Sequence, residues 1–400
     1  MPASPLRPLA TLFVICVIDV LGFGIMVPLV PYMADRFGAA PAVITPILGV
    51  YSLFQLLANP LLGRLSDRYG RRPILIFSMA GAGVSYLILG FATNLGWLLA
   101  SRVLGGLMAG NLATVFAYAS DVSAPRDRAR ALGIMGAAIG TGFMLGPALG
   151  GVLAGEDEAH ANFLLPALVA AMLALVALTL VWRLLPESHG PGERAKQVGV
   201  VQHFHPWALL RAKPGLRWLV LGALCVIFAQ STLESIYAIW AMNRFGVGPR
   251  TIGLSLFALA VVAVTMQGGL VRMLVPRLGE YRLALAGIIA YVLGLLTVGM
   301  GGSLATAIAG MALVGLGVGA FNPSSSSLVA AQADTGNRGA VLGTYQASAS
   351  LARVIGPLCS GAIYSRIGHS APYLVAAAVA VQASWCILAA RRHPGTVHAP

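Results

Sequence analysis

The chain alternates between long apolar stretches and short polar segments rich in proline, glycine, aspartate and arginine. A helix needs roughly 20 apolar residues to cross the hydrocarbon core of a bilayer. Twelve stretches meet this requirement, and we predict a membrane-spanning helix for each: 8–32, 41–62, 73–94, 96–119, 130–154, 162–185, 216–242, 251–275, 282–300, 303–331, 339–364 and 371–390. The first stretch is too long for a signal peptide and contains Asp19, so we expect it to be a retained span.

The basic residues are unevenly shared between the two sides of these spans. With the N-terminus inside, twenty of the 26 lysines and arginines fall on the inner side and four on the outer side. Lysine and arginine accumulate on the cytoplasmic face of membrane proteins, so both termini are predicted to be cytoplasmic. The net charge of +13 is thereby explained by topology, and no nucleic acid partner is expected.

The longest polar stretch divides the spans six and six. It predicts a six-helix bundle over residues 1–185, a cytoplasmic linker over 186–215 and a second six-helix bundle over 216–400. A weak internal repeat supports two related halves. Gly146-Pro147 recurs 210 positions later as Gly356-Pro357, and Arg68-Tyr69-Gly70-Arg71 recurs 209 positions later as Arg277-Leu278-Gly279-Glu280.

Composition excludes several classes of protein. With 58% hydrophobic and 10% charged residues, the chain is unlike a soluble domain. No phosphate-binding loop of the G-x-x-x-x-G-K-[ST] type occurs, so neither an ATP-driven pump nor an enzyme is expected. The four cysteines lie inside apolar stretches and never as C-x-x-C, so we expect no disulfide framework, metal site or cofactor.

Away from their ends, the predicted spans contain four charged residues: the acids Asp19 and Glu234 and the arginines Arg102 and Arg353. Each costs at least ~2.5 kcal/mol at the centre of a membrane helix unless it is paired or hydrated. A buried carboxylate that exchanges partners can load and release a proton. We therefore predict two switchable pairs for proton coupling, Asp19 with Arg102 and Glu234 with Arg353. The alternative is that either pair is a permanent ion pair that fixes helix packing.

A second group of residues is predicted to line a substrate cavity. Its members are mid-span amides and their neighbours: Gln55, Asn59, Gln230, Glu234, Tyr237 and Met26. Gln230 stands one turn before Glu234 on the same face of a helix. Hydrogen bonds between helices explain the amides equally well.

Two further patterns predict gating parts. The tight loop between spans two and three places one acid among arginines, in an arrangement that can lock helix ends and release them: Gly63, Asp67, Arg68, Gly70, Arg71 and Arg72. Positive charge that merely holds the loop inside is the alternative. In the fifth span, Gly142, Gly146 and Gly150 recur every four residues beside Pro147. They predict a flat, kinked face, which we expect to seal against the opposite half.

These motifs together resemble the major facilitator superfamily. The loop from Gly63 to Arg72 is similar to its G-x-L-x-D-R-x-G-R-[RK] signature, and the glycines of the fifth span resemble its antiporter motif. Arg102 followed by Gly106 and Gly110 resembles the fourth-helix motif. The run from Asp19 to Pro31 resembles the first helix of the twelve-span drug:proton antiporters, and Asn243-Arg244-Phe245-Gly246 points to their tetracycline-efflux branch.

The resemblance implies two pseudo-symmetric six-helix bundles with substrate bound between them. It also implies an inner gate at Asp67, proton coupling through Asp19 and Arg102, a monomer, and a place in the bacterial inner membrane with a role in antibiotic resistance. The chain departs from the tetracycline exporters at three positions. It has Ser85 and Tyr291 where they carry membrane acids, and Ala263 where they carry a histidine. The second-half copy of the loop also has Pro276 in place of the aspartate.

We therefore expect a secondary active transporter that exports amphipathic organic compounds or drugs in exchange for protons by alternating access. Its partners would be the lipid bilayer, protons and a small-molecule substrate. One alternative keeps the fold and makes the cargo a metabolite, lipid or sugar. Another is a membrane receptor or scaffold that transports nothing.

Overall fold

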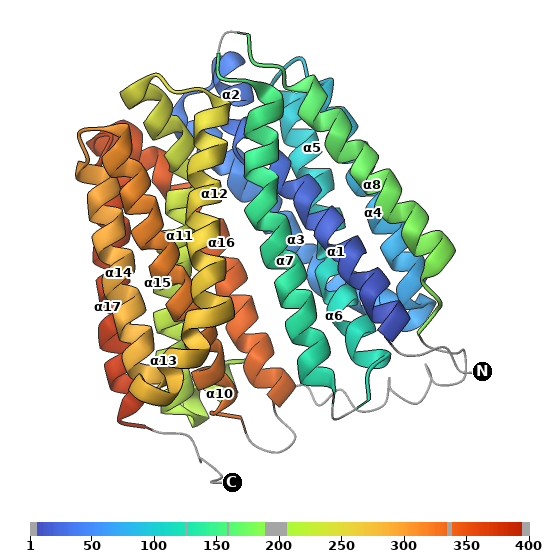
Figure 1. Cartoon of the computed structure of the whole chain (residues 1–400), viewed down its shortest axis with the longest axis vertical. Coiled ribbons are helices and arrows are strands. Elements are labelled where there is room, and N and C mark those ends of the chain that lie inside the picture. The colour runs from blue at the N-terminus through green and yellow to red at the C-terminus, as the bar shows by residue number, and fades with distance from the viewer. Residues whose placement is uncertain (1–5, 125–126, 158–159, 189–205, 334–337, 394–400) are drawn as a thin grey trace. The chain divides into compact units, whose positions relative to one another are not determined.

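The computed structural model describes residues 6–124, 127–157, 160–188, 206–333 and 338–393. Within these ranges every regular element is a helix (Figure 1). In chain order the elements are α1 (Leu6–Met26), α2 (Leu29–Arg36), α3 (Pro41–Tyr69), α4 (Arg71–Gly90), α5 (Leu95–Met108), the 3₁₀ turn η1 (Ala109–Asn111), α6 (Leu112–Asp121), α7 (Arg128–Ala154), α8 (Leu164–Leu184), α10 (Pro206–Ala212), α11 (Pro214–Phe245), α12 (Pro249–Thr265), the π-helical turn η3 (Met266–Leu270), α13 (Val271–Leu278), α14 (Glu280–Met300), α15 (Leu304–Ala330), α16 (Arg338–Ile367) and α17 (Ala371–Arg391).

The helices confirm the predicted all-α membrane protein. Eleven helical segments in the described part of the chain are long and apolar enough to cross a membrane. The remaining predicted span, 339–364, coincides with α16, which has 30 residues but falls short in hydropathy because it carries several serines and Arg353. The predicted count of twelve is thus confirmed for eleven, and α16 has the length but not the apolar composition.

The chain divides into two compact units. Unit 1 comprises Met1–Ala39, Val50–Val201 and Val247–Leu254, and unit 2 comprises Ala40–Gly49, Gln202–Gly246 and Ser255–Pro400. The predicted division into residues 1–185 and 216–400 stays a prediction, and most of its linker lies outside the described residues.

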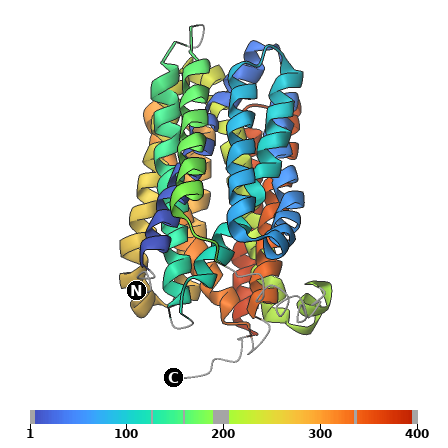
Figure 2. The same ribbon diagram turned by 90° about the vertical axis from the view of Figure 1, so that its right-hand side faces the viewer.

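Unit 1 is held together by α1, which packs along α7 and α8, while α4 packs against α5 and α8 (Figures 1 and 2). Its core combines Leu12, Ile15 and Cys16 of α1 with Met135 of α7 and Val181 of α8. These side chains are almost completely buried, so their packing gives α1 a fixed position among its neighbours.

The glycines of α7 explain how closely α1 and α7 approach. A Cβ atom on Gly142 would lie 2.7 Å from the Cβ of Val20, and one on Gly146 would lie 2.6 Å from the Cα of Gly24. Only glycine fits such contacts. The sequence interpretation expected this glycine face to seal against the opposite half, whereas Gly142, Gly146 and Gly150 each face α1 within unit 1.

Unit 2 is built around α11, which packs against α15, α16 and α17. From Ala229 to Met242 this helix is buried on nearly every side, with only Gln230 partly exposed and Glu234 exposed. A second close pair, α14 and α15, meets through glycines on both helices, including Gly287 and Gly317.

The internal repeat in the sequence has a counterpart in each unit. Gly70 separates α3 from α4 with φ = 108°, and Gly279 separates α13 from α14 with φ = 77°. Both dihedrals lie in the region that favours glycine. Gly356 of α16 packs against Ser231 of α11, much as Gly146 of α7 packs against α1. The two matching motifs therefore perform the same local tasks in the two units.

Candidate functional site

The mid-span acid of unit 1, Asp19, is held by a neutral amide. The Asn111 Nδ2 atom donates a hydrogen bond to the Asp19 carboxylate at 3.1 Å. Asn111 is 2% exposed and ends the 3₁₀ turn η1, which interrupts the helical path between α5 and α6. Its other amide atom, Oδ1, is buried without a hydrogen-bond partner in the part of the chain that the structure describes.

The predicted partner of Asp19 does not contact it in this structure. Within the described residues, no ion pair joins Arg102 to Asp19. The Arg102 guanidinium carbon lies 5.7 Å from the centre of the Tyr51 ring, and its Nε reaches Ser101 Oγ at the long distance of 3.5 Å. Arg102 is 3% exposed, and no described residue makes a hydrogen bond with its Nη2 atom. Among the described residues, the buried Arg102 guanidinium and the Asp19 carboxylate are therefore not paired with each other.

The amides predicted to line a cavity on α3 have different surroundings. The Gln55 Nε2 atom donates to the carbonyl oxygen of Ala109 at 3.3 Å. That carbonyl belongs to η1, where the regular hydrogen-bond ladder is interrupted, so Gln55 satisfies the freed backbone group. Asn59 has a buried Oδ1 atom without a partner. Met26, predicted for the same cavity, is fully buried in unit 1 and lines no open surface in this structure.

The mid-span acid of unit 2 is placed differently. Glu234 is exposed, and its carboxylate accepts a hydrogen bond of 2.9 Å from Gln230 Nε2 one turn earlier on α11. Arg353 of α16 is also exposed and lies within electrostatic range of Glu234, but no ion pair joins the two residues within the described structure. Tyr237, predicted to line the cavity, is 1% exposed and stacks on Trp240, so it belongs to the interior of unit 2.

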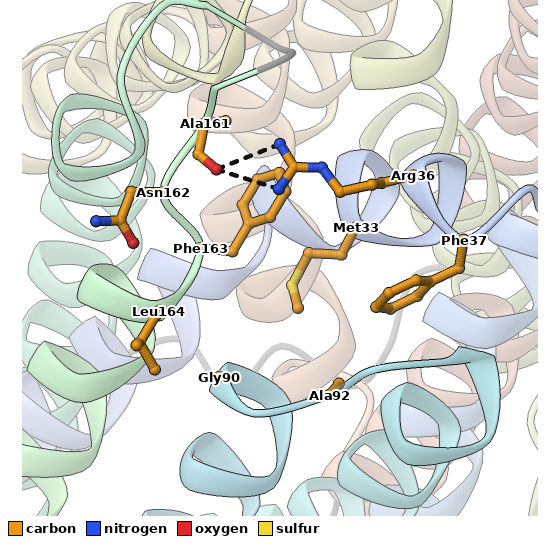
Figure 3. A pocket seen from close by; sticks show the side chains of 9 residues that line it. All are labelled: Met33, Arg36, Phe37, Gly90, Ala92, Ala161, Asn162, Phe163 and Leu164. Atoms are coloured by element: carbon orange, nitrogen blue, oxygen red, sulfur yellow. Dashed lines mark hydrogen bonds between the residues drawn. The ribbon is translucent and has the colours of Figure 1, made fainter.

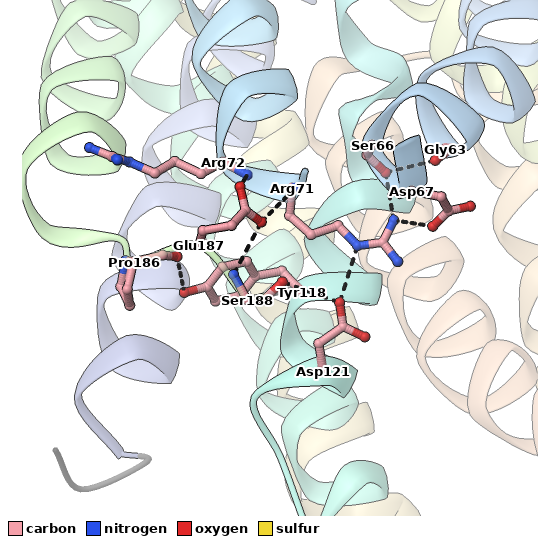
Figure 4. Close-up of polar contacts among 10 residues, drawn as sticks. All are labelled: Gly63, Ser66, Asp67, Arg71, Arg72, Tyr118, Asp121, Pro186, Glu187 and Ser188. Atoms are coloured by element: carbon pink, nitrogen blue, oxygen red, sulfur yellow. Dashed lines mark hydrogen bonds and ion pairs between the residues drawn. The ribbon is translucent and has the colours of Figure 1, made fainter. Parts of the chain in front are cut away.

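The predicted gating loop forms a dense polar network in unit 1 (Figure 4). Arg71 is its centre: its guanidinium contacts Asp67 at 2.5 Å, Asp121 at 3.1 Å and Ser66 Oγ at 2.6 Å. Gly70, with its positive φ, turns the chain between α3 and α4 and so places Arg71 at the first position of α4. Arg68 forms no ion pair with any described acid, and its guanidinium carbon lies 5.4 Å from the centre of the Tyr69 ring.

Glu187, just beyond α8, completes this network. Its carboxylate accepts hydrogen bonds from the backbone N–H groups of Arg71 at 2.8 Å and Arg72 at 3.3 Å (Figure 4). The first N–H groups of a helix have no partner within it, and the helix dipole favours a negative charge there. Glu187 therefore caps α4, while the Arg72 side chain donates to the carbonyl oxygen of Trp182 near the end of α8. The network ties α3, α4, α6 and α8 of unit 1 together at one end.

This arrangement of helices and motifs agrees with the comparison to known families. The sequence profile of the Major Facilitator Superfamily matches residues 12–304 and 270–400. The chain belongs to that superfamily. Its members are transporters rather than enzymes, so this superfamily protein is an integral, multi-pass membrane transporter.

Relatives within the superfamily include bacterial drug-resistance proteins. The chain is 34% identical over 359 residues to the class G tetracycline resistance protein of Vibrio anguillarum, covering 87% of this chain and 88% of that one. It is 32% identical over 358 residues to the class C protein of Escherichia coli, covering 87% of both. The predicted similarity to the tetracycline-efflux branch is thereby confirmed.

Another relative comes from animals. Major facilitator superfamily domain-containing protein 10 of Bos taurus is 29% identical over 425 residues, covering 94% of this chain and 91% of the relative. The crystal structure of the human organic anion transporter MFSD10 superposes with a TM-score of 0.72 at 24% identity, covering 96% of this chain and 100% of that one. At this identity the superposition supports the fold.

One cavity of about 290 Å³ lies in unit 1 of this superfamily member, apart from the residues discussed above (Figure 3). Arg36 closes one side of it by donating to the carbonyl oxygen of Ala161 at 3.3 Å and by covering the Phe163 ring at 4.5 Å. The lining residues are Met33, Arg36, Phe37, Gly90, Ala92, Ala161, Asn162, Phe163 and Leu164. None of them belongs to the predicted coupling or substrate residues, so we do not assign substrate binding to this cavity.

Sequence reasoning missed three polar residues that the structure brings to these sites: Asn111, Asp121 and Glu187. Asn111 carried a usable signal, because it is a lone amide within the apolar fourth span. Asp121 and Glu187 looked like ordinary acids at helix ends, since their partner Arg71 is 50 and 116 positions away in sequence.

Proposed function

We propose that this transporter is a secondary antiporter that exports amphipathic organic compounds in exchange for protons by alternating access. Two relatives above 30% identity are named for resistance to tetracycline, which supports a drug-like cargo. The absence of a nucleotide-binding loop in the sequence supports an ion gradient as the energy source. A membrane potential of 100 mV supplies about 2.3 kcal/mol per charge moved, enough for roughly fifty-fold accumulation.

The observation that carries the proposal is the contact between Asp19 and Asn111. A carboxylate in an ion pair resists protonation, whereas one held by a neutral amide can gain a proton without leaving a bare cation behind. The amide also suits both forms of the acid: Nδ2 donates to the carboxylate, and the partnerless Oδ1 can accept from the protonated acid. Asp19 is therefore the proposed proton carrier, with Asn111 as its support and Arg102 as the charge that attracts it in another state.

The proposed topology, location, oligomeric state and gate are those predicted from the sequence. Both termini lie in the cytoplasm, the protein resides in the bacterial inner membrane as a monomer, and the network around Arg71 acts as a gate at the inner ends of its helices. The substrate contacts include Gln230, Glu234 and Arg353, which are polar or charged residues of unit 2 that are at least partly exposed.

The proposal is tested with Asp19→Asn in reconstituted vesicles that carry an imposed pH gradient. We expect gradient-driven efflux of an amphipathic dye to fall at least about tenfold, because an amide cannot carry the proton. Exchange of the dye without a gradient should persist, since that process needs no proton. Asp35→Asn, which neutralises an acid in α2 outside the proposed machinery, is the matched control. Wild-type gradient-driven efflux in the Asp19→Asn protein would remove Asp19 from the mechanism.

A further inference from the structure

Two charged residues in the middle of helices of unit 2, Glu234 and Arg353, are not explained by helix packing. Glu234 and Arg353 both stand mid-helix, both are exposed, and neither is in an ion pair within the described residues. Intramembrane charges normally face a protein interior or a water-filled space, because each is expensive in lipid. Two opposite charges that are held near each other, yet left open, are suited to a ligand that brings the complementary charges.

The backbone around them fixes how they are spaced. Ser231 Oγ donates to the carbonyl oxygen of Arg353 at 3.2 Å, which ties α11 to α16 at this level. Gly356 lies one turn further along α16, and a Cβ atom there would come within 2.9 Å of the Ser231 Cβ. Glu234 stands three residues after Ser231 on α11. The two charges therefore flank a tight helix contact and cannot drift apart without breaking it.

The repeat in unit 1 shows that this helix contact does not require charges. Gly146 of α7 makes the corresponding close contact with Gly24 of α1. The residue three positions before Gly146 is Phe143, in the place that Arg353 holds before Gly356, and α1 carries no charged residue from Val20 to its end at Met26. The close contact between α11 and α16 therefore does not require a permanent ion pair to stabilise it.

Two residues near Glu234 bear on ligand binding: Gln230 orients its carboxylate, and Tyr291 has a hydroxyl that makes no hydrogen bond with a described residue. Gln230 Nε2 donates to the Glu234 carboxylate, which holds that side chain in one orientation while its exposed part stays open. Tyr291 of α14 lies within electrostatic range of Glu234 and is fully buried, yet its hydroxyl has no hydrogen-bond partner among the described residues. A buried hydroxyl without a partner is uncommon in a finished interior and marks a place that a ligand or water can complete.

We propose that Glu234 and Arg353 form a two-charge substrate site, and that the preferred substrates are amphipathic zwitterions whose cationic group meets Glu234 and whose anionic group meets Arg353. This inference rests on the proposed function only for the statement that the bound compound is also the exported one. Charge-assisted hydrogen bonds at both ends exceed what a compound with one charge can make. A compound lacking either charge makes only one of the two charge-assisted contacts, so it binds more weakly.

The test uses a fluorescent zwitterion, Nε-dansyl-lysine, with two derivatives of the same skeleton. Its methyl ester keeps only the cation, and its Nα-acetyl form keeps only the anion. Binding to the full chain in nanodiscs, without any pH gradient, is followed by dansyl fluorescence. We expect the zwitterion to bind at least about tenfold more tightly than either derivative.

Variants assign each charge to its residue. Glu234→Gln should abolish the preference for the zwitterion over the acetylated form, and Arg353→Gln should abolish its preference over the ester. Glu234→Asp and Arg353→Lys keep the charges and should retain most of the preference, which separates charge recognition from damage to the fold. Arg366→Gln, an exposed arginine near the end of the same helix α16, is the matched control and should bind like the wild type.

Three results would overturn the proposal: equal affinity for all three compounds, a zwitterion preference that survives both Gln variants, or no saturable binding by any of the three. The proposed function is tested by a different measurement, so either proposal can fail without the other. Asp19→Asn should keep the zwitterion preference in nanodiscs whether or not it loses gradient-driven transport, because Asp19 is no part of this charged pair.

Discussion

The two membrane-embedded acids of this transporter are similar in sequence context and different in structure. Asp19 and Glu234 both stand mid-helix, and each accepts a hydrogen bond from an amide. The amide that holds Asp19 comes from a different helix 92 positions away and is almost completely buried. The amide that holds Glu234 lies one turn earlier on its own helix, and the carboxylate itself is exposed.

This difference suggests a division of tasks between the two units. In the described part of the chain, Asp19 accepts a side-chain hydrogen bond from Asn111 alone, and this bond depends on tertiary structure. Because no second donor shares the contact, protonation of Asp19 acts directly on that bond. The exposed Glu234 carboxylate is accessible to a ligand, so it is better suited to binding a ligand than to carrying a proton. Removing each amide, labelling the position of each acid from solution and replacing one buried tyrosine hydroxyl in each unit test this division of tasks.

The largest expected effect comes from Asn111→Leu, a substitution of similar size. It leaves the Asp19 carboxylate without its hydrogen bond in a mostly buried setting, which should cost about 2 kcal/mol of stability. The measurement is the free energy of unfolding of the purified protein from a denaturant titration in detergent. Gln230→Met removes the corresponding amide from Glu234, where water can replace it, so the expected loss is below about 0.5 kcal/mol. Equal losses for the two variants would contradict the contrast between the units.

The second prediction concerns access from solution. In a background without the four native cysteines, Glu234→Cys should react with a charged methanethiosulfonate reagent about tenfold faster than Asp19→Cys, because Glu234 is exposed and Asp19 is only partly so. Thr232→Cys supplies the buried reference on α11, since Thr232 is 1% exposed. Faster labelling at position 19 than at position 234 would reverse the proposed assignment of tasks.

The spans were predictable because the hydrophobic pattern reports the environment of each helix directly. The irregular turns inside those spans were not. The 3₁₀ turn η1 contains Gly110 and the π-helical turn η3 contains Gly268 and Gly269, but glycines occur throughout the spans and do not by themselves fix the place of an irregular turn. Gln55 supports η1 by donating to the Ala109 carbonyl oxygen. That support comes from another helix, so a reading along the chain could not locate it.

The candidate coupling residues were predictable as a set, but their pairing was not. Charge alone favours Asp19 with Arg102, and the structure instead gives Asp19 to Asn111. Which of two nearby donors reaches a carboxylate depends on side-chain geometry across helices, and the periodicity of a single helix contains no such information. The same limit explains the glycines of α7, whose spacing predicted a tight contact but not that α1 would be the partner.

The smallest expected effect compares two buried tyrosines. Tyr118 in unit 1 donates from its hydroxyl to the carbonyl oxygen of Pro186 at 2.8 Å, whereas the Tyr291 hydroxyl in unit 2 has no partner. Tyr118→Phe should therefore lower the free energy of unfolding by about 1 kcal/mol, the usual net value of one hydrogen bond. Tyr291→Phe loses no bond and removes a buried polar group, so stability should stay within about 0.5 kcal/mol of the wild type or rise. A loss at Tyr291 as large as that at Tyr118 would mean that its hydroxyl is already satisfied in the protein without a ligand, and the case for an unfilled contact beside Glu234 would then rest on the two charges alone.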